Sequence, residues 1–131
     1  MNEQFEDILE WIEKADHDLA SAKIIYLHLP DHFDTIAFHC QQASEKYLKA
    51  LLIYYKIGFS RSHDLIYLLE LLSVKIEIDE SKFRKAVLLN GFGVQIRYPN
   101  KIVKPTKEEI ESAIEISQEF RSFATNILEI K

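Results

Sequence analysis

The chain has 131 residues, which is enough for one domain with its own hydrophobic core. Its formal net charge of −5 at pH 7 excludes a general electrostatic grip on nucleic acid, so any such contact requires a local basic patch. A single cysteine excludes an internal disulfide framework and a cysteine-based zinc site, and it agrees with a reducing cytoplasm.

Apolar periodicity predicts a first helix over residues 3–28 and a second helix over about 32–56. Pro30 ends the first helix, Asp31 is expected to cap the second, and Gly58 follows its end. The buried stripe expected for the second helix consists of Ile36, Cys40, Ala43, Tyr47, Ala50, Leu51 and Tyr54.

Two shorter helices are predicted next. Ser62 is expected to cap the third helix, which turns its leucines inward. Asp79 is expected to cap the fourth, which should loosen at Gly91 and Gly93 because glycine is a poor helix former.

A final helix to about residue 129 is predicted by the capping-box spacing Thr106-x-x-Glu109. No repeat, low-complexity tract or linker-like composition interrupts the chain, so residues 1–131 are interpreted as a single domain. Long amphipathic helices with short connections settle as antiparallel neighbours. The predicted fold is therefore all-α, with the second and last long helices packed antiparallel in the core.

The stretch Ile96-Arg97-Tyr98-Pro99-Asn100 is predicted to be an irregular island after the fourth helix. Arg97 carries a planar fork of donors that suits phosphate or carboxylate. We expect it to line a cleft near the start of the second helix or near His63, with Tyr98 beside it. The alternative is that Arg97 bonds the last carbonyls of a helix.

The second helix also carries a polar sector opposite its apolar stripe, made up of His39, Gln41, Gln42, Glu45, Lys46 and Lys49. One interpretation is a solvated face, in which Glu45 and Lys49 form an ordinary i, i+4 surface pair. The other interpretation is a partner surface, because Phe38 and Leu52 lie in or beside the sector. Glutamine amides also suit the recognition of another chain or of a base edge.

Four ordered motifs extend over nearly the whole chain: Trp11 with Lys14–Leu19, His39–Leu52, His63–Leu65 with Leu68-Leu69, and Arg97-Tyr98-Pro99. They resemble four patterns of the HEPN family: W-x-x-x-A-x-x-D-L, Q-Q-A-x-E-K-x-L-K-A-L-L, H-D-L-x-x-L-L and R-Y-P. Members of this family are small prokaryotic helical domains, often encoded beside a minimal nucleotidyltransferase. The resemblance implies an up-and-down bundle of four to five helices that forms a homodimer.

The resemblance also implies an activity, since many members of that family are metal-independent endoribonucleases and often toxins neutralised by the nucleotidyltransferase. Their active site is an R-x(4–6)-H motif near the dimer interface. This chain departs from it, because no histidine follows Arg97, and Asn100 stands where relatives usually have aspartate. In toxin members a tyrosine just beyond the catalytic histidine is adenylylated; Tyr98 follows Arg97 directly, so that role does not transfer to it.

Metal-free RNA cleavage requires proton transfer and a cation for the phosphorane. Arg97 is the candidate cation, and His63 is the imidazole that the resemblance supports, with a structural role at a helix start as its alternative. If the chain is instead a non-catalytic binding subunit, Gln42, Lys46 and Tyr98 are its candidate contacts to nucleotide, RNA or partner. No metal or other cofactor is expected.

A weaker alternative is a metal-dependent phosphohydrolase, because His39, His63-Asp64 and Asp79 loosely follow the order of His/Asp metal ligands.

A homodimer is expected on a second ground, which is apolar surplus outside the main stripes at Phe38, Leu52, Phe92 and Phe123. No signal peptide or membrane-spanning run is recognised, so a cytoplasmic location without membrane contact is expected.

Overall fold

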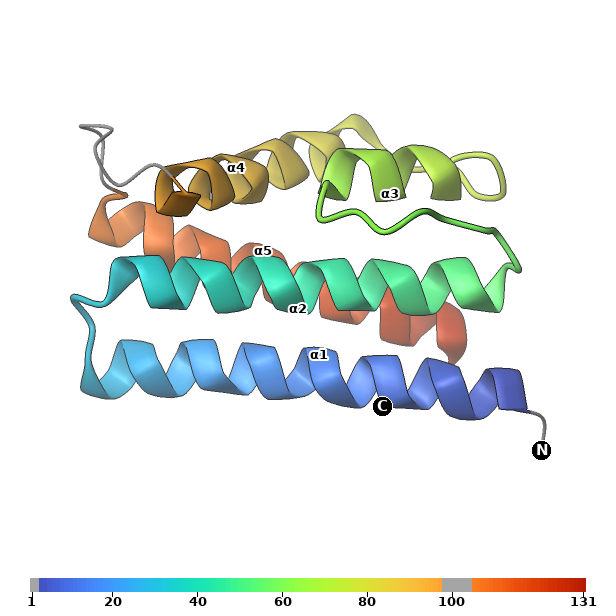
Figure 1. Ribbon diagram of the computed structural model, residues 1–131, viewed down its shortest axis with the longest axis horizontal. Coiled ribbons are helices and arrows are strands. Elements are labelled where there is room, and N and C mark those ends of the chain that lie inside the picture. Colours follow the sequence, from blue (N-terminus) through green and yellow to red (C-terminus); the bar gives the residue numbers. More distant parts are fainter. Residues whose placement is uncertain (1–2, 98–104) are drawn as a thin grey trace.

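The computed structural model describes the backbone of residues 3–97 and 105–131, and the side chains of 3–92 and 105–131. These residues form five helices, α1 (Glu3–His28), α2 (Phe33–Tyr54), α3 (Leu65–Leu72), α4 (Glu80–Arg97) and α5 (Lys107–Leu128) (Figure 1). No strand occurs in the described ranges. The all-α bundle predicted from periodicity is confirmed.

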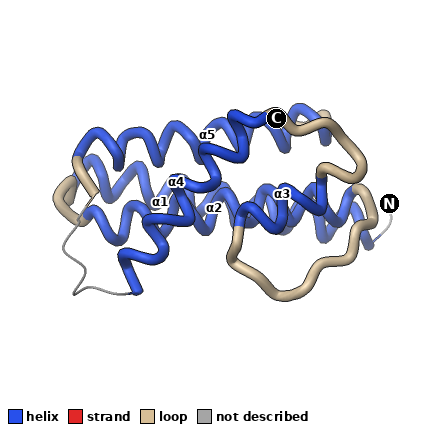
Figure 2. Tube along the Cα trace, turned by 90° about the horizontal axis from the view of Figure 1, so that it is seen from above, coloured by secondary structure: helices blue, strands red, loops and turns tan. Residues whose placement is uncertain are grey.

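The four long helices alternate in direction, and α3 is an addition between the second and third of them (Figure 1). The connection over residues 55–64 doubles back along α2, so that α3 runs in the same direction as α2. Figure 2 shows this connection bulging away from the helices on one side of the bundle.

The predicted antiparallel packing of the second and last helices is wrong, because α2 and α5 run parallel. Both are antiparallel to α1, as shown for α5 by the paired side chains Asp16–Arg121 and Tyr26–Glu111. The two helices would be antiparallel if each of the three connections between them reversed the direction of the chain. The doubled-back connection removes one of these reversals.

The central helix of the bundle is α2, which packs against each of the other four helices. Its predicted apolar stripe is buried except at Tyr54, which is 45% exposed. Its polar sector is not the solvated face that one interpretation favoured, since Gln41, Glu45 and Lys49 are buried too. A single apolar stripe predicts a half-buried helix, whereas neighbours on several sides bury the polar residues as well.

Two predicted helix starts are confirmed. Asp79 Oδ1 accepts a hydrogen bond of 2.9 Å from the amide of Lys82 at the start of α4. Thr106 and Glu109 form the reciprocal capping box at the start of α5. Each cap satisfies amide groups that the helix itself leaves without partners.

Two other predicted caps are wrong. His32, not Asp31, precedes α2, and its side chain makes no capping bond. Asp64 caps α3 by accepting from the backbone amide of Ile66. Ser62 lies two residues earlier, where its hydroxyl accepts from the backbone amide of Asp64. Asp64 has the extended backbone that a capping residue needs.

The fourth helix does not loosen at its glycines, because α4 continues through Gly91 and Gly93 to Arg97. Glycine lowers helix propensity by only about 1 kcal/mol, which tertiary packing readily offsets. Ile96 and Arg97 are therefore helical, whereas residues 98–104 lie outside the described residues.

Of the predicted apolar surplus, only Phe38 is exposed, and Phe123 is half-buried against the core. Leu52 and Phe92 belong to the core, whereas Phe38 is 44% exposed. Val87 and Leu88 on α4 are also exposed. None of the described helices combines the length and hydrophobicity needed to cross a bilayer.

The core makes a direct prediction about stability. Leu68 is fully buried in α3, and Leu68→Ala should lower the free energy of unfolding by about 2–5 kcal/mol through lost contacts and a residual cavity. Val74 is 80% exposed, so Val74→Ala should change it by less than about 0.5 kcal/mol. Urea titration followed by circular dichroism measures both, and equal effects would contradict this assignment of the core.

Candidate functional site

A buried carboxylate on α2 organises the polar part of the structure. Glu45 Oε2 accepts a hydrogen bond of 3.0 Å from Lys49 Nζ, one turn later on the same helix. Its other oxygen, Oε1, lies 2.8 Å from Nδ1 of His63. We call Glu45, Lys49 and His63 the Glu45 triad. The carboxylate and ammonium are 4% and 8% exposed, whereas the imidazole is 54% exposed.

The backbone around His63 is fixed from two sides. The side-chain amide of Gln41, one turn before Glu45 on α2, donates to the backbone carbonyl of His63 at 2.9 Å. On α4, Asn90 donates to Asp64 at 2.8 Å and accepts from the amide of Leu65 at 3.2 Å. The start of α3 is thereby tied to both α2 and α4, so the imidazole is held at a fixed place on the bundle.

Aromatic rings cover the buried lysine. The ammonium of Lys49 lies 5.6 Å from the ring centre of Trp11 and 5.9 Å from that of Phe59. Ring faces carry partial negative charge and attract a cation, the more so where water is excluded. Trp11 comes from α1 and Phe59 from the doubled-back connection, so this contact also packs the connection onto the bundle.

A second group of one carboxylate, one histidine and one lysine joins α1 to α2. Asp18 Oδ1 lies 3.1 Å from Nδ1 of His39, and Asp18 Oδ2 accepts from Lys46 Nζ. We call Asp18, His39 and Lys46 the Asp18 triad. Lys46 was a candidate for nucleotide or partner binding, but its ammonium is engaged within the chain and its side chain is only 22% exposed.

Gln42, the other α2 candidate, is half-buried, and its side chain makes no hydrogen bond to a described residue. Its role in binding stays a prediction.

Arg97 is the last residue of α4, at the end of the bundle where α2 begins (Figure 1). It lies seven residues beyond Asn90, a rise of about 10 Å along the helix. Its side chain, and the whole of Tyr98, are outside the described residues. A cleft that brings Arg97 and Tyr98 to His63 therefore stays a prediction.

A half-buried network of hydrogen bonds ties α1, α2 and α5 together. Asp16 accepts hydrogen bonds from the phenol of Tyr47 and, at 2.9 Å, from Nε of Arg121. Burial, and next the Asp16 carboxylate, raise the pKa of Tyr47, so the phenol keeps its proton. The hydrogen bond to Asp16 raises the pKa of Arg121 in turn.

The lone cysteine has no reactive character. Cys40 is fully buried, and burial raises the pKa of its thiol to about 12. The thiolate is the nucleophilic form, so nucleophilic chemistry at this residue is disfavoured.

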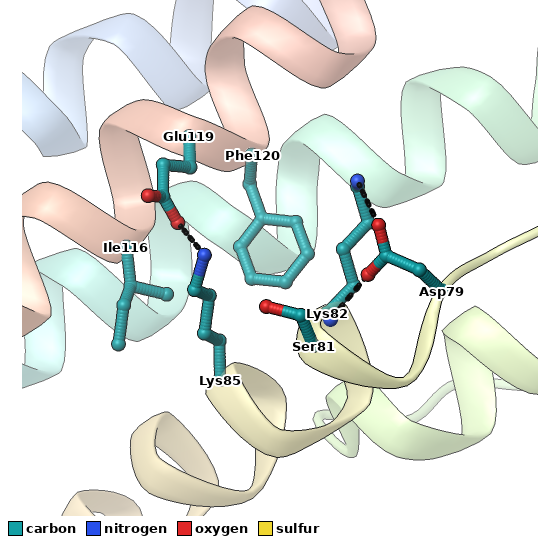
Figure 3. Close-up of a pocket in the computed structure, with 7 residues that line it drawn as sticks. All are labelled: Asp79, Ser81, Lys82, Lys85, Ile116, Glu119 and Phe120. Atoms are coloured by element: carbon teal, nitrogen blue, oxygen red, sulfur yellow. Dashed lines mark hydrogen bonds and ion pairs between the residues drawn. The ribbon is translucent and has the colours of Figure 1, made fainter.

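A small cavity of about 170 Å³ lies between the start of α4 and α5 (Figure 3). Its lining residues are Asp79, Ser81, Lys82, Lys85, Ile116, Glu119 and Phe120. Lys85 pairs with Glu119 at 2.6 Å, and Lys82 with Asp79 at 3.6 Å (Figure 3). Both cations are thus neutralised within the cavity, which makes it a poor site for a phosphate.

The metal-dependent alternative gains no support from the geometry. His39 is held by Asp18, His63 by Glu45, and Asp79 caps α4, so the three are engaged separately. Within residues 3–92 and 105–131, no group of three or more His, Cys, Asp or Glu side chains converges as a metal site would require.

Sequence reasoning missed Glu45 and Lys49 as site residues because it treated them as an exposed pair. One signal was available in the sequence, because the apolar Leu52 lies in or beside the same sector, as expected on a covered face. In the structure Leu52 is fully buried. The sequence did indicate His63, which the triad holds by its ring nitrogen.

The tie at Asn90 predicts a loss of stability. Asn90→Ala removes the acceptor for the Leu65 amide and the donor to Asp64, so the free energy of unfolding should fall by about 1–2 kcal/mol. Asn126 is exposed on α5, and Asn126→Ala is the matched control, with a change below about 0.5 kcal/mol. Thermal or urea unfolding compares the two; equal stabilities would show that the tie contributes nothing.

Comparisons with solved structures support the same fold. TT1696 from Thermus thermophilus matches with a TM-score of 0.79 and 27% identity, covering 91% of this chain and 96% of that one. An HEPN domain protein from Thermotoga maritima matches with a TM-score of 0.74 and 22% identity over 92% and 98% of the two chains. An archaeal HEPN homologue matches with a TM-score of 0.72 and 21% identity, covering 91% of this chain and 95% of that one.

A search of curated proteins found no match. Among protein families, the HEPN domain matches residues 8–128, which include all of α2, α3, α4 and α5 and most of α1. That range also contains both triads and the Asn90 tie. The chain therefore belongs to the HEPN domain family.

Proposed function

We propose that this HEPN-domain protein is the cytoplasmic partner of a minimal nucleotidyltransferase in a toxin–antitoxin-like pair, and that it acts on RNA through His63 and Arg97. The observation that carries the proposal is the exposed imidazole of His63, backed by the buried carboxylate of Glu45. An imidazole changes its protonation state near neutral pH, and a carboxylate behind its Nδ1 is the arrangement by which many acid–base sites orient histidine.

In this proposal, RNA cleavage proceeds by proton transfer. His63 takes the proton of a ribose 2′-hydroxyl, whose oxygen attacks the neighbouring phosphorus to form a 2′,3′-cyclic phosphate. The bond from that phosphorus to the 5′ oxygen breaks, and a water molecule passes the proton from His63 to the leaving 5′ oxygen. Arg97 supplies the cation that stabilises the charge on the phosphorane. The rigid tie of His63 to α2 and α4 supports this role, because a proton acceptor must be held in place to act.

The second candidate function is a binding subunit that does not cut RNA. The observation that favours it is the absence of any histidine after Arg97, which breaks the R-x(4–6)-H motif. Arg97, Tyr98 and Gln42 then contact phosphate, base or partner protein, and the nucleotidyltransferase supplies the chemistry.

The decisive experiment is incubation of the purified protein with structured and single-stranded RNA in EDTA. We expect cleavage by the wild type, with a fall of about 100-fold or more in His63→Gln and in Arg97→Ala. His17 is an exposed histidine, so His17→Gln is the control and should cleave like the wild type. RNA or nucleotide binding without cleavage, lost in Arg97→Ala, would support the binding subunit. Neither cleavage nor binding would contradict both functions.

The proposed partner makes a genomic prediction. A short reading frame with the pattern G-S-x(10)-D-x-D should lie beside this gene, and its product should co-purify with this chain. A neighbourhood without such a frame, or a product that elutes separately, would contradict the pairing.

A homodimer is proposed through the face of α4. Val87 and Leu88 are exposed there, and Leu88 borders a groove between α4 and α5 with Phe92 and Ile116. Light scattering at micromolar concentration should give a dimer for the wild type and a monomer for Leu88→Glu. Val74→Glu, on a more exposed apolar residue that does not line this groove, should stay dimeric. A wild-type monomer would exclude the dimer.

A further inference from the structure

The two triads share one chemical arrangement. In each, one carboxylate oxygen accepts from a lysine ammonium and the other faces Nδ1 of a histidine. A lysine ammonium only donates hydrogen bonds and a carboxylate only accepts them. The histidine nitrogen that faces the carboxylate must therefore be the donor, and so must carry the proton.

We infer that Glu45 and Lys49 are positioning residues that fix the neutral imidazole of His63 with its proton on Nδ1 and the lone pair of Nε2 toward solvent. The short Nδ1–Oε1 distance of 2.8 Å sets the orientation of the ring. Because Glu45 is buried, water does not compete for that oxygen as it does at the surface. Without such a partner, neutral imidazole exchanges its proton between both nitrogens.

The outward nitrogen is available to a ligand. The imidazole is 54% exposed, and no described residue is hydrogen-bonded to Nε2. A lone pair at this place accepts a hydroxyl or N–H donor and gains nothing from a bare phosphate oxygen. This deepens the proposed function, on which it rests: the group that faces His63 is a donor, such as the ribose 2′-hydroxyl that DNA lacks.

The conservative variant Glu45→Gln tests how Lys49 orients the side chain at position 45. The amide oxygen at position 45 would accept from Lys49, because the ammonium can only donate. The amide NH₂ would then face His63 and donate to Nδ1, so the proton of the imidazole would move to Nε2. This variant should therefore invert the tautomer while keeping both hydrogen bonds.

The chain contains its own controls. His39 in the Asp18 triad should show the same Nδ1–H form, and Asp18→Asn should invert it there while leaving His63 unchanged. His17 is exposed and 3.9 Å from Glu13, so its proton should exchange between both nitrogens.

The experiment is a long-range ¹H–¹⁵N correlation spectrum of the ¹⁵N-labelled full chain, at a pH where the histidines are neutral. We expect a protonated Nδ1 and an unprotonated Nε2 for His63 in the wild type, and the reverse in Glu45→Gln. A wild-type His63 with its proton on Nε2, or with the averaged pattern of His17, would overturn the inference. The wild-type spectrum decides this even if the variant fails to fold.

A cleavage assay separates this inference from the proposed function. If the wild type cleaves RNA, kcat of folded Glu45→Gln should fall at least about tenfold with KM little changed, because the outward nitrogen then donates. Wild-type activity in Glu45→Gln would overturn the positioning role. A wild type with the expected tautomer and no cleavage would contradict the proposed function and leave the tautomer inference supported.

Discussion

The polar part of the structure is arranged around one constraint, which is the burial of an ionised pair in the middle of the central helix. A charge removed from water is costly unless another charge and hydrogen bonds compensate for it. Lys49 provides the charge for Glu45, and His63 provides the donor for the remaining carboxylate oxygen. To deliver that donor, the connection after α2 has to return along the helix. This return sets the direction of α3 and makes α2 and α5 parallel (Figure 1).

The same constraint links the fold to the proposed chemistry. The carboxylate of Glu45, which is paired with Lys49, fixes an imidazole whose other side faces solvent. The fold thus holds His63 just before α3 by hydrogen bonds from α2 and α4, and α4 is the helix that ends with Arg97. In the proposed function, the R-x(4–6)-H histidine that this chain lacks is replaced by a histidine from a different segment.

The sequence predicted the helices well because periodicity reports which residues face a core, and the Thr106–Glu109 spacing specifies its own hydrogen bonds. It predicted His63 as a site residue from a resemblance. It could not predict that Glu45 and Lys49 are buried, because a pair four residues apart has the same spacing on a solvated helix as on a covered one. The cap at Asp64 was missed for a similar reason, since Ser62 two residues earlier has an equally suitable side chain. The sequence made Lys46 a candidate for ligand or partner binding, whereas in the structure its ammonium is paired with Asp18.

The buried pair of Glu45 and Lys49 thus serves to position His63 more than to stabilise the bundle. The most direct measurement is the free energy of unfolding of Lys49→Met and of the double variant Glu45→Met/Lys49→Met. The single variant leaves a buried carboxylate without its cation and should lose about 3–5 kcal/mol. The double variant replaces the pair by apolar side chains of similar length and should stay within about 1 kcal/mol of the wild type. It should also release His63, whose imidazole proton then exchanges between both nitrogens as in His17. A double variant as unstable as the single, or one that keeps the proton on Nδ1 of His63, would contradict the account.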